Sequence, residues 1–195
     1  ADTRSTARTR SSSSSRERRR SAGTSAGPAG AAGVPFCHGS GATGSGGRSF
    51  WSTDHCSASA LARFVSDNPI KTLLAIGHIR KRTRGAVTLA NTHPFSRELW
   101  GRHWVFAHNG TVRGARALKL GQFRPIGNTD SEHAYCHLLE ALRSSFSSYP
   151  KKVSELWQAV ADVGRRIGRH GSFNFLLGDG RHLYARCGTK LCYLI

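Results

Sequence analysis

The sequence predicts an α+β fold in which antiparallel strands pack against helices. Two observations predict it. Apolar residues recur at helical spacing in 58–67, 131–146 and 152–169. Short apolar runs, from Thr72 to His78 and from Trp104 to His108, are typical of buried strands.

Each predicted helix carries a start or stop signal. The Asn-Pro pair at 68–69 ends the first helix, because a residue before proline avoids helical dihedrals. Thr129 or Asp130 caps the second helix, and Glu132 in its first turn suits the helix dipole. Gly171 follows the third helix and fits a C-terminal stop.

Turn residues predict how the strands are connected. Asn-Gly at 109–110 is a tight-turn signal after the second apolar run. Gly-Asp-Gly at 178–180 predicts a hairpin between strands 172–177 and 181–186. The residues between the two apolar runs, including 92–95, predict a long polar loop.

The composition divides the chain into two parts. Residues 1–48 consist mostly of Arg, Ser, Gly and Ala, including a serine run at 11–15. Such a segment buries too little apolar surface to offset its ordering entropy, so we expect 1–48 to be disordered. Residues 49–195 are expected to form the domain.

Positive charge is spread along the whole 195-residue chain. The net charge is +18, of which residues 1–56 hold +5 (8 Arg, 3 acids) and 57–195 hold +13 (21 Lys plus Arg, 8 acids). A basic field favours anionic partners such as nucleic acid, phosphorylated metabolites or an acidic protein. A solvated basic surface explains the charge equally simply, and we favour that interpretation.

The cysteines and histidines indicate neither a disulfide framework nor a metal site. The number of cysteines is odd and no C-x-x-C pair occurs, which fits a reducing cytoplasm. The spacings of the histidines in the candidate segments match no standard zinc pattern, and we expect no metal and no cofactor; these are His78, His93, His103 and His108. No apolar stretch reaches the length of a membrane span.

Four residues suggest a site for an amino acid. Arg80 after a strand offers a planar fork to a carboxylate, or makes a surface ion pair. Asp130 receives an ammonium group, or only caps a helix. Asn109 and Gly110 offer two N–H donors to a developing oxyanion, or only form a turn.

The order of these motifs resembles the class II glutamine amidotransferases. His-x-Arg, His-Pro, His-Asn-Gly and Thr-Asp-Ser-Glu occur in that order, and the wider text looks like the stand-alone bacterial branch of the family. The segments that carry this resemblance are 69–71, 77–80, 91–95, 97–102, 107–110, 123–125, 128–132 and 170–177.

The resemblance implies an N-terminal-nucleophile hydrolase fold, an α-β-β-α sandwich that is incomplete in this chain. It implies that L-glutamine is the substrate, and that Arg80, helped by Thr83, binds its α-carboxylate. Asp130 then binds the α-ammonium group, and Asn109 with Gly110 forms the oxyanion hole. The partner that accepts ammonia is not identified by the motifs.

The nucleophile of this family is a cysteine at the mature N-terminus, whose own α-amino group shuttles the proton. The first residue here is Ala1, and the cysteine nearest the start, Cys37, lies far from it. We hypothesise that 1–48 is an out-of-frame reading and that Ile195 cuts a strand short. We therefore expect an inactive chain.

Three functions remain open at this point. The first is a glutamine amidotransferase domain that hydrolyses glutamine to glutamate and ammonia in the intact family. The second is a non-catalytic glutamine-binding module. The third is a basic nucleic-acid-binding protein, which we place last because no aromatic-rich RNA-binding motif or helix-turn-helix is present.

Overall fold

A computed structural model describes residues 31–37, 47–54, 58–68, 72–80 and 87–189. The helices are α1 (Ala60–Asp67), α2 (Asp130–Ser145) and α3 (Val153–Gly168), with 3-10 turns η1 (Leu89–Asn91) and η2 (Ala115–Ala117). The strands are β1 (Ala31–Cys37), β2 (Gly47–Ser52), β3 (Leu74–Ala75), β4 (His78–Arg80), β5 (Phe95–Leu99), β6 (Arg102–Val112), β7 (Gly171–Gly178) and β8 (Leu183–Arg186).

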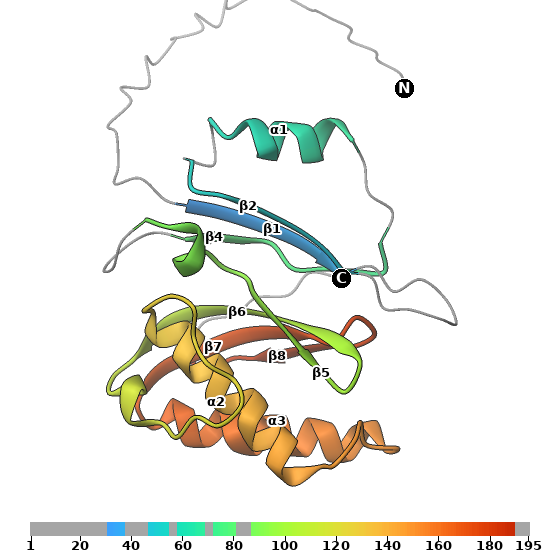
Figure 1. Ribbon diagram of the computed structural model, residues 1–195, viewed down its shortest axis with the longest axis vertical. Coiled ribbons are helices and arrows are strands. Elements are labelled where there is room, and N and C mark those ends of the chain that lie inside the picture. The colour runs from blue at the N-terminus through green and yellow to red at the C-terminus, as the bar shows by residue number, and fades with distance from the viewer. Residues whose placement is uncertain (1–30, 38–46, 55–57, 69–71, 81–86, 190–195) are drawn as a thin grey trace, which may run out of the picture.

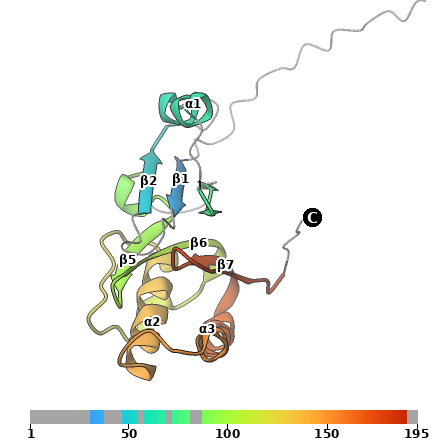
Figure 2. The same ribbon diagram turned by 90° about the vertical axis from the view of Figure 1, so that its right-hand side faces the viewer.

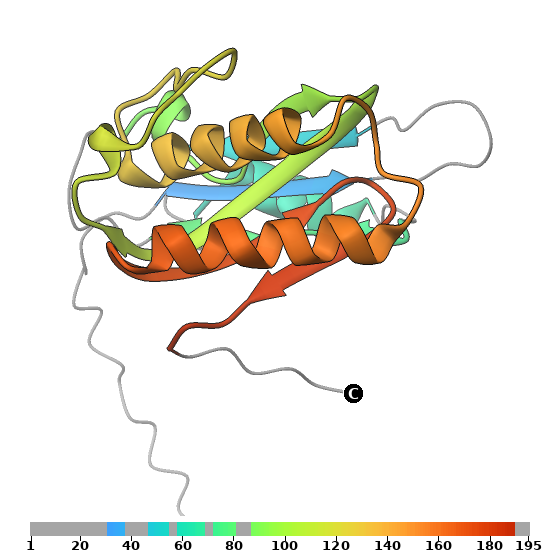
Figure 3. The same ribbon diagram turned by 90° about the horizontal axis from the view of Figure 1, so that it is seen from below.

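The described strands form two antiparallel sheets that lie against each other. In the first, β1 pairs with β2, β3 and β4; the second has the order β5-β6-β7-β8. Helix α1 lies on the outer side of the first sheet, and α2 and α3 run side by side under the second (Figures 1, 2 and 3). This helix–sheet–sheet–helix stack confirms the predicted α+β architecture.

Strand β6 lies at the centre of the stack and is buried on both faces. Trp104 and Phe106 belong to the large core beneath α2 and α3, whereas Val105 and Ala107 pack with Ile76 in a smaller core on the other face. Successive side chains of a strand point to opposite faces, so a strand between two packed layers is apolar throughout. This explains the uninterrupted apolar run in the sequence.

The predicted helices are confirmed, with bounds that differ by one or two residues. The α2 helix begins after Thr129, whose hydroxyl accepts a hydrogen bond from the backbone N–H of Glu132. The buried residues of α3 follow a spacing of four, three and four, which places one apolar stripe against the sheet; they are Leu156, Val160, Val163 and Ile167.

The predicted polar loop around 92–95 is wrong in part, because β5 begins at Phe95. Strand β5 forms a hairpin with β6, in which Leu99 pairs with Arg102. The two residues of the turn, Trp100 and Gly101, have φ values of 57° and 70°. Two positive φ values are typical of a type I′ turn, which usually carries Asn-Gly. Trp-Gly is a weak sequence signal for it, and tertiary packing of Trp100 on Phe146 and Tyr149 supports the turn.

The turn predicted at 109–110 is also wrong, because β6 continues through both residues to Val112. Gly110 has a φ of 148° and lies opposite Phe173, and Gly171 has a φ of 147° opposite Val112. A Cβ on Gly110 would overlap the carbonyl oxygen of Ser172, and one on Gly171 would overlap that of Thr111. The glycine therefore permits a close approach of two strands rather than a turn.

Two further expectations differ from the structure. The strand predicted from Thr72 to His78 is divided into β3 and β4, although both keep antiparallel pairing with β1. Strand β1 itself lies within 1–48, where composition predicts disorder. It pairs with strands on both sides, and such tertiary hydrogen bonding is invisible to a compositional argument.

We expect Gly171→Ala to destabilise the fold by about 3 kcal/mol or more, because strain at positive φ adds to steric overlap with Thr111. Gly114→Ala is the matched control, since Gly114 has a φ of 65° but nothing within 4 Å of an added Cβ. It should cost only about 1 kcal/mol. Urea unfolding measures both, and equal losses would contradict the steric explanation.

Candidate functional site

Asp130 joins the start of α2 to the end of β6. Its Oδ2 accepts a hydrogen bond of 2.7 Å from the backbone N–H of Val112, and its Oδ1 accepts one of 2.9 Å from Ser131 N–H. A carboxylate at a helix N-terminus is favoured by the helix dipole. Thr129 is the N-cap residue, and the Asp130 carboxylate also satisfies one backbone N–H of the first turn.

Asn109 and Gly110 lie side by side on β6, two to three residues before Val112. Both are exposed, in contrast to the buried residues that precede them. The backbone carbonyl of Asn109 accepts a hydrogen bond of 3.1 Å from the side chain of Asn174, which holds this part of β6 against β7. The side-chain amide of Asn109 makes no hydrogen bond to another described residue.

His108 connects three elements around these residues, a role that sequence reasoning missed, since it treated His108 only as part of the His-Asn-Gly motif and as a candidate metal ligand. Its Nε2 lies 3.1 Å from the Ser172 carbonyl, which can only accept, so Nε2 carries the proton. Its Nδ1, 2.8 Å from Ser131 Oγ, then accepts the hydroxyl proton. Burial holds the pKa of His108 below its usual value, against the opposing effects of the Ser172 bond and the Asp130 charge.

The strand that precedes the predicted carboxylate-binding loop reaches the same place. His78 in β4 donates from Nε2 to the carbonyl of His108 at 3.2 Å, and its ring packs on that of His93 at 4.3 Å between centroids. The backbone of Arg80, two residues further, pairs with β1. The side chain of Arg80 and the whole of Thr83 lie outside the described residues.

The loop that leads into α2 is held by Glu132, whose importance the sequence did not reveal. This buried carboxylate accepts hydrogen bonds from the backbone N–H groups of Ile126 and Gly127 and forms an ion pair of 2.6 Å with Arg97. Because Arg97 belongs to β5, Glu132 ties this loop and strand to the first turn of α2. Asp130 lies in this same first turn of α2.

Cys136 is poorly suited to act as a nucleophile at this site. Cys136 is fully buried in α2, and burial raises its pKa to about 11, so that its thiol stays protonated at neutral pH. Cys187 is exposed beyond β8, and Cys37 is the last residue of β1.

Neither a metal-binding cluster nor a membrane-spanning helix occurs in the described part of the chain. No group of three or more His, Cys, Asp or Glu side chains within it is arranged to hold a metal ion. None of its helices combines the length and apolar character needed to cross a membrane.

We expect Glu132→Gln to lower the free energy of unfolding by about 3 kcal/mol, because Arg97 would lose its buried counter-charge. Asp162→Asn is the control, since it removes an ion pair with Arg165 whose side chains are 40% and 65% exposed. Its cost should stay below about 1 kcal/mol. Urea denaturation compares them, and a negligible loss in Glu132→Gln would contradict the role given to this carboxylate.

Acidification should destabilise the protein partly through His108. Its folded pKa lies below the unfolded value of 6.5, so the folded state binds fewer protons, and stability is lost as pH falls through that value. In His108→Gln, unfolding free energy should fall less than in the wild type between about pH 7.5 and about pH 5. Unchanged pH dependence would show that His108 does not contribute.

Comparisons with known proteins agree with this geometry. A family model described as "Glutamine amidotransferases class-II" matches residues 9–195, beginning upstream of the motifs recognised in the sequence. "Putative glutamine amidotransferase YafJ" of Escherichia coli (strain K12) is 42% identical over 151 residues, 77% of this chain and 59% of that protein. "Putative glutamine amidotransferase" of Haemophilus influenzae is 40% identical over 169 residues, 84% and 57% respectively. The chain thus spans less than three fifths of the length of these relatives.

Solved structures show the same fold. The 2.0 Å crystal structure of a "predicted glutamine amidotransferase from Pseudomonas aeruginosa PA01" matches with a TM-score of 0.63 and 37% identity over 80% of this chain and 59% of that one. A class-II domain protein from Silicibacter pomeroyi matches with a TM-score of 0.52 at 20% identity, over 80% and 75%, which supports the fold alone. The sequence matches, and the agreement in fold, show that this chain belongs to the class II glutamine amidotransferase family.

Proposed function

We propose that this chain binds L-glutamine in a site formed by β6, the start of α2 and the end of β4. The observation that carries the proposal is the hydrogen bond from Val112 N–H to Asp130, because it fixes an anionic group to the strand that carries Asn109 and Gly110. An ammonium acceptor and two neutral donors are thereby held on one rigid scaffold.

The spacing along β6 fits the length of glutamine. Gly110 and Val112 are two residues apart, which corresponds to about 6.6 Å along a strand. In extended glutamine the α-nitrogen and the amide carbon are separated by four covalent bonds, or about 5 Å. One glutamine can therefore place its ammonium group near Asp130 and its amide near Asn109 and Gly110.

Asp130 retains the capacity to bind this ammonium group. A carboxylate offers about four lone-pair positions, and backbone N–H groups of Val112 and Ser131 occupy two. Arg80, with Thr83, supplies the fork for the α-carboxylate in this proposal, because β4 leads toward the site through the His78 contact with His108. The glutamine-binding unit comprises residues 49–195 together with β1.

The reaction that this arrangement supports is amide hydrolysis. A thiolate attacks the amide carbon, and the resulting oxyanion receives hydrogen bonds from the Asn109 side chain and the Gly110 backbone. Ammonia leaves with a transferred proton, and water then hydrolyses the thioester to glutamate. In this proposal the described residues bind glutamine and stabilise the oxyanion, and the buried, protonated thiol of Cys136 is not the nucleophile.

We therefore propose that the chain alone binds glutamine without turning it over, as a non-catalytic binding module would. A measurement of ammonia release distinguishes a glutamine-hydrolysing enzyme from a non-catalytic glutamine-binding module. Glutamine binding without ammonia release supports the binding module, whereas ammonia release above that of a buffer blank would show that a nucleophile is present.

We expect Asp130→Asn to weaken glutamine binding about thirtyfold, or about 2 kcal/mol, because an amide cannot offer a full charge to the ammonium group. Isothermal titration calorimetry with L-glutamine measures the change. Asp67→Asn, an exposed substitution in the last residue of α1, is the matched control and should bind as the wild type does.

Circular dichroism shows whether Asp130→Asn keeps its fold, since the asparagine oxygen can still accept from Val112 N–H. A folded Asp130→Asn protein with wild-type affinity would contradict the assignment. So would a wild-type chain that shows no heat of binding with L-glutamine.

A further inference from the structure

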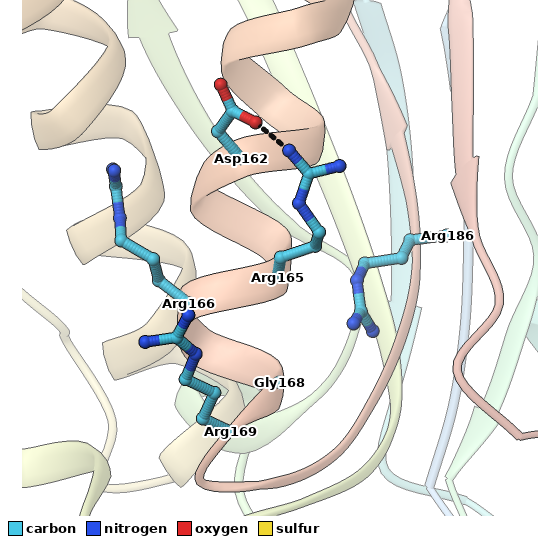
Figure 4. A pocket seen from close by; sticks show the side chains of 6 residues that line it. All are labelled: Asp162, Arg165, Arg166, Gly168, Arg169 and Arg186. Atoms are coloured by element: carbon cyan, nitrogen blue, oxygen red, sulfur yellow. Dashed lines mark hydrogen bonds and ion pairs between the residues drawn. The ribbon is translucent and has the colours of Figure 1, made fainter.

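A recess lined by arginines lies at the C-terminal end of α3, where β8 crosses the helix. Its volume is about 510 Å³ and its lining consists of Asp162, Arg165, Arg166, Gly168, Arg169 and Arg186, which we call the arginine recess. Figure 4 shows three of the arginines projecting from the last turns of α3, while Arg186 reaches toward the helix from the strand. None of these residues has a role in the proposed glutamine site.

Two glycines of α3 leave the space that the Arg186 side chain occupies. A Cβ on Gly168 would lie 2.5 Å from Arg186 Nη2, and one on Gly164 would lie 2.8 Å from Arg186 Cδ. The guanidinium also donates a hydrogen bond to the Phe173 carbonyl and lies 5.9 Å from the centre of the Phe173 ring. The side chain is therefore held in one place, with its charge directed at the recess.

The recess has an excess of positive charge. Asp162 forms an ion pair with Arg165, and no ion pair of Arg166, Arg169 or Arg186 occurs among the described residues. Basic residues in the last turn of a helix complement its dipole, which accounts for Arg165 and Arg166. That explanation does not extend to Arg186, which comes from β8 and uses one of its five N–H donors on Phe173 within the described structure.

We propose that the arginine recess binds the phosphate groups of a small phosphorylated molecule. Guanidinium groups bind phosphate oxygens in pairs through parallel hydrogen bonds, and several around one hollow suit a polyphosphate better than a single carboxylate. The volume falls within the range of small-molecule sites, about 300–1,000 Å³. The site would also use part of the net positive charge that glutamine binding leaves unexplained.

This proposal stands on different residues from the glutamine site, so either can fail without the other. The probe is inorganic pyrophosphate, titrated by calorimetry into the 195-residue chain at constant ionic strength. We expect saturable binding at one site. A chain that shows no heat of binding with pyrophosphate would overturn the proposal.

Paired charge substitutions locate the binding. Arg166→Gln/Arg169→Gln removes two exposed guanidinium groups of the recess and should weaken pyrophosphate binding about tenfold or more. Lys151→Gln/Lys152→Gln removes the same charge from the other end of α3, about 22 Å away, and should leave the affinity within about twofold. Equal losses in the two variants would show diffuse attraction to a basic surface and overturn the proposal.

Gly168→Ala tests the position of the Arg186 guanidinium without changing the charge of the recess. Alanine favours helix over glycine, so α3 should be at least as stable, while the new Cβ displaces the Arg186 guanidinium. Pyrophosphate binding should weaken, with thermal unfolding no lower than in the wild type. Wild-type affinity in this variant, or binding of single-stranded oligonucleotide that pyrophosphate cannot displace, would contradict a small-molecule phosphate site.

Discussion

The burial of β6 on both faces is the constraint on which the rest of the structure depends. Trp104 and Phe106 must enter the core beneath the helices, and Val105 and Ala107 must enter the core between the sheets. A shift of one residue would exchange the two sets, so the register is strongly determined. The exposed pair Asn109 and Gly110 thereby takes a fixed position where the apolar run ends, at the junction of sheet and helix.

Polar groups then connect this strand to its surroundings. The His108 ring bridges α2 and β7, and its backbone carbonyl accepts from β4, so one residue joins three elements. On the far side of the α2 terminus, the buried Glu132 carboxylate holds the preceding loop and Arg97. Asp130 precedes Ser131 and Glu132 directly in the first turn of α2. Buried neighbours of this kind would reduce the reorganisation that the proposed glutamine binding requires.

The positive charge of the chain has two separate consequences in the structure. Arg97 forms a buried ion pair with Glu132 that stabilises the fold. In the arginine recess, Arg166, Arg169 and Arg186 form no ion pair with another described residue. The recess lies on the helix side of the second sheet, and the proposed glutamine site uses the start of α2 and the end of β6.

The sequence by itself determined the family and the helices, and it proposed the candidate site residues. Periodic apolar residues mark α2 and α3, and the ordered motifs around His78, Asn109 and Asp130 bring together residues that the structure places near one another. The binding roles of Arg80, Thr83 and Asp130, and the oxyanion role of Asn109 and Gly110, remain predictions. Local patterns succeeded because capping and amphipathic burial act over a few residues.

Only the tertiary structure decided the remainder. Strand β1 lies in a stretch dominated by small residues and pairs with strands on both sides, and the Trp-Gly turn is accompanied by ring contacts of Trp100 with the distant Phe146 and Tyr149. Asn109 and Gly110 signal a turn locally, but close contact with β7 keeps them in a strand. Glu132 and His108 acquire their roles from partners that are 23 to 64 residues away in the chain. Such long-range contacts leave no local pattern for a sequence argument to detect.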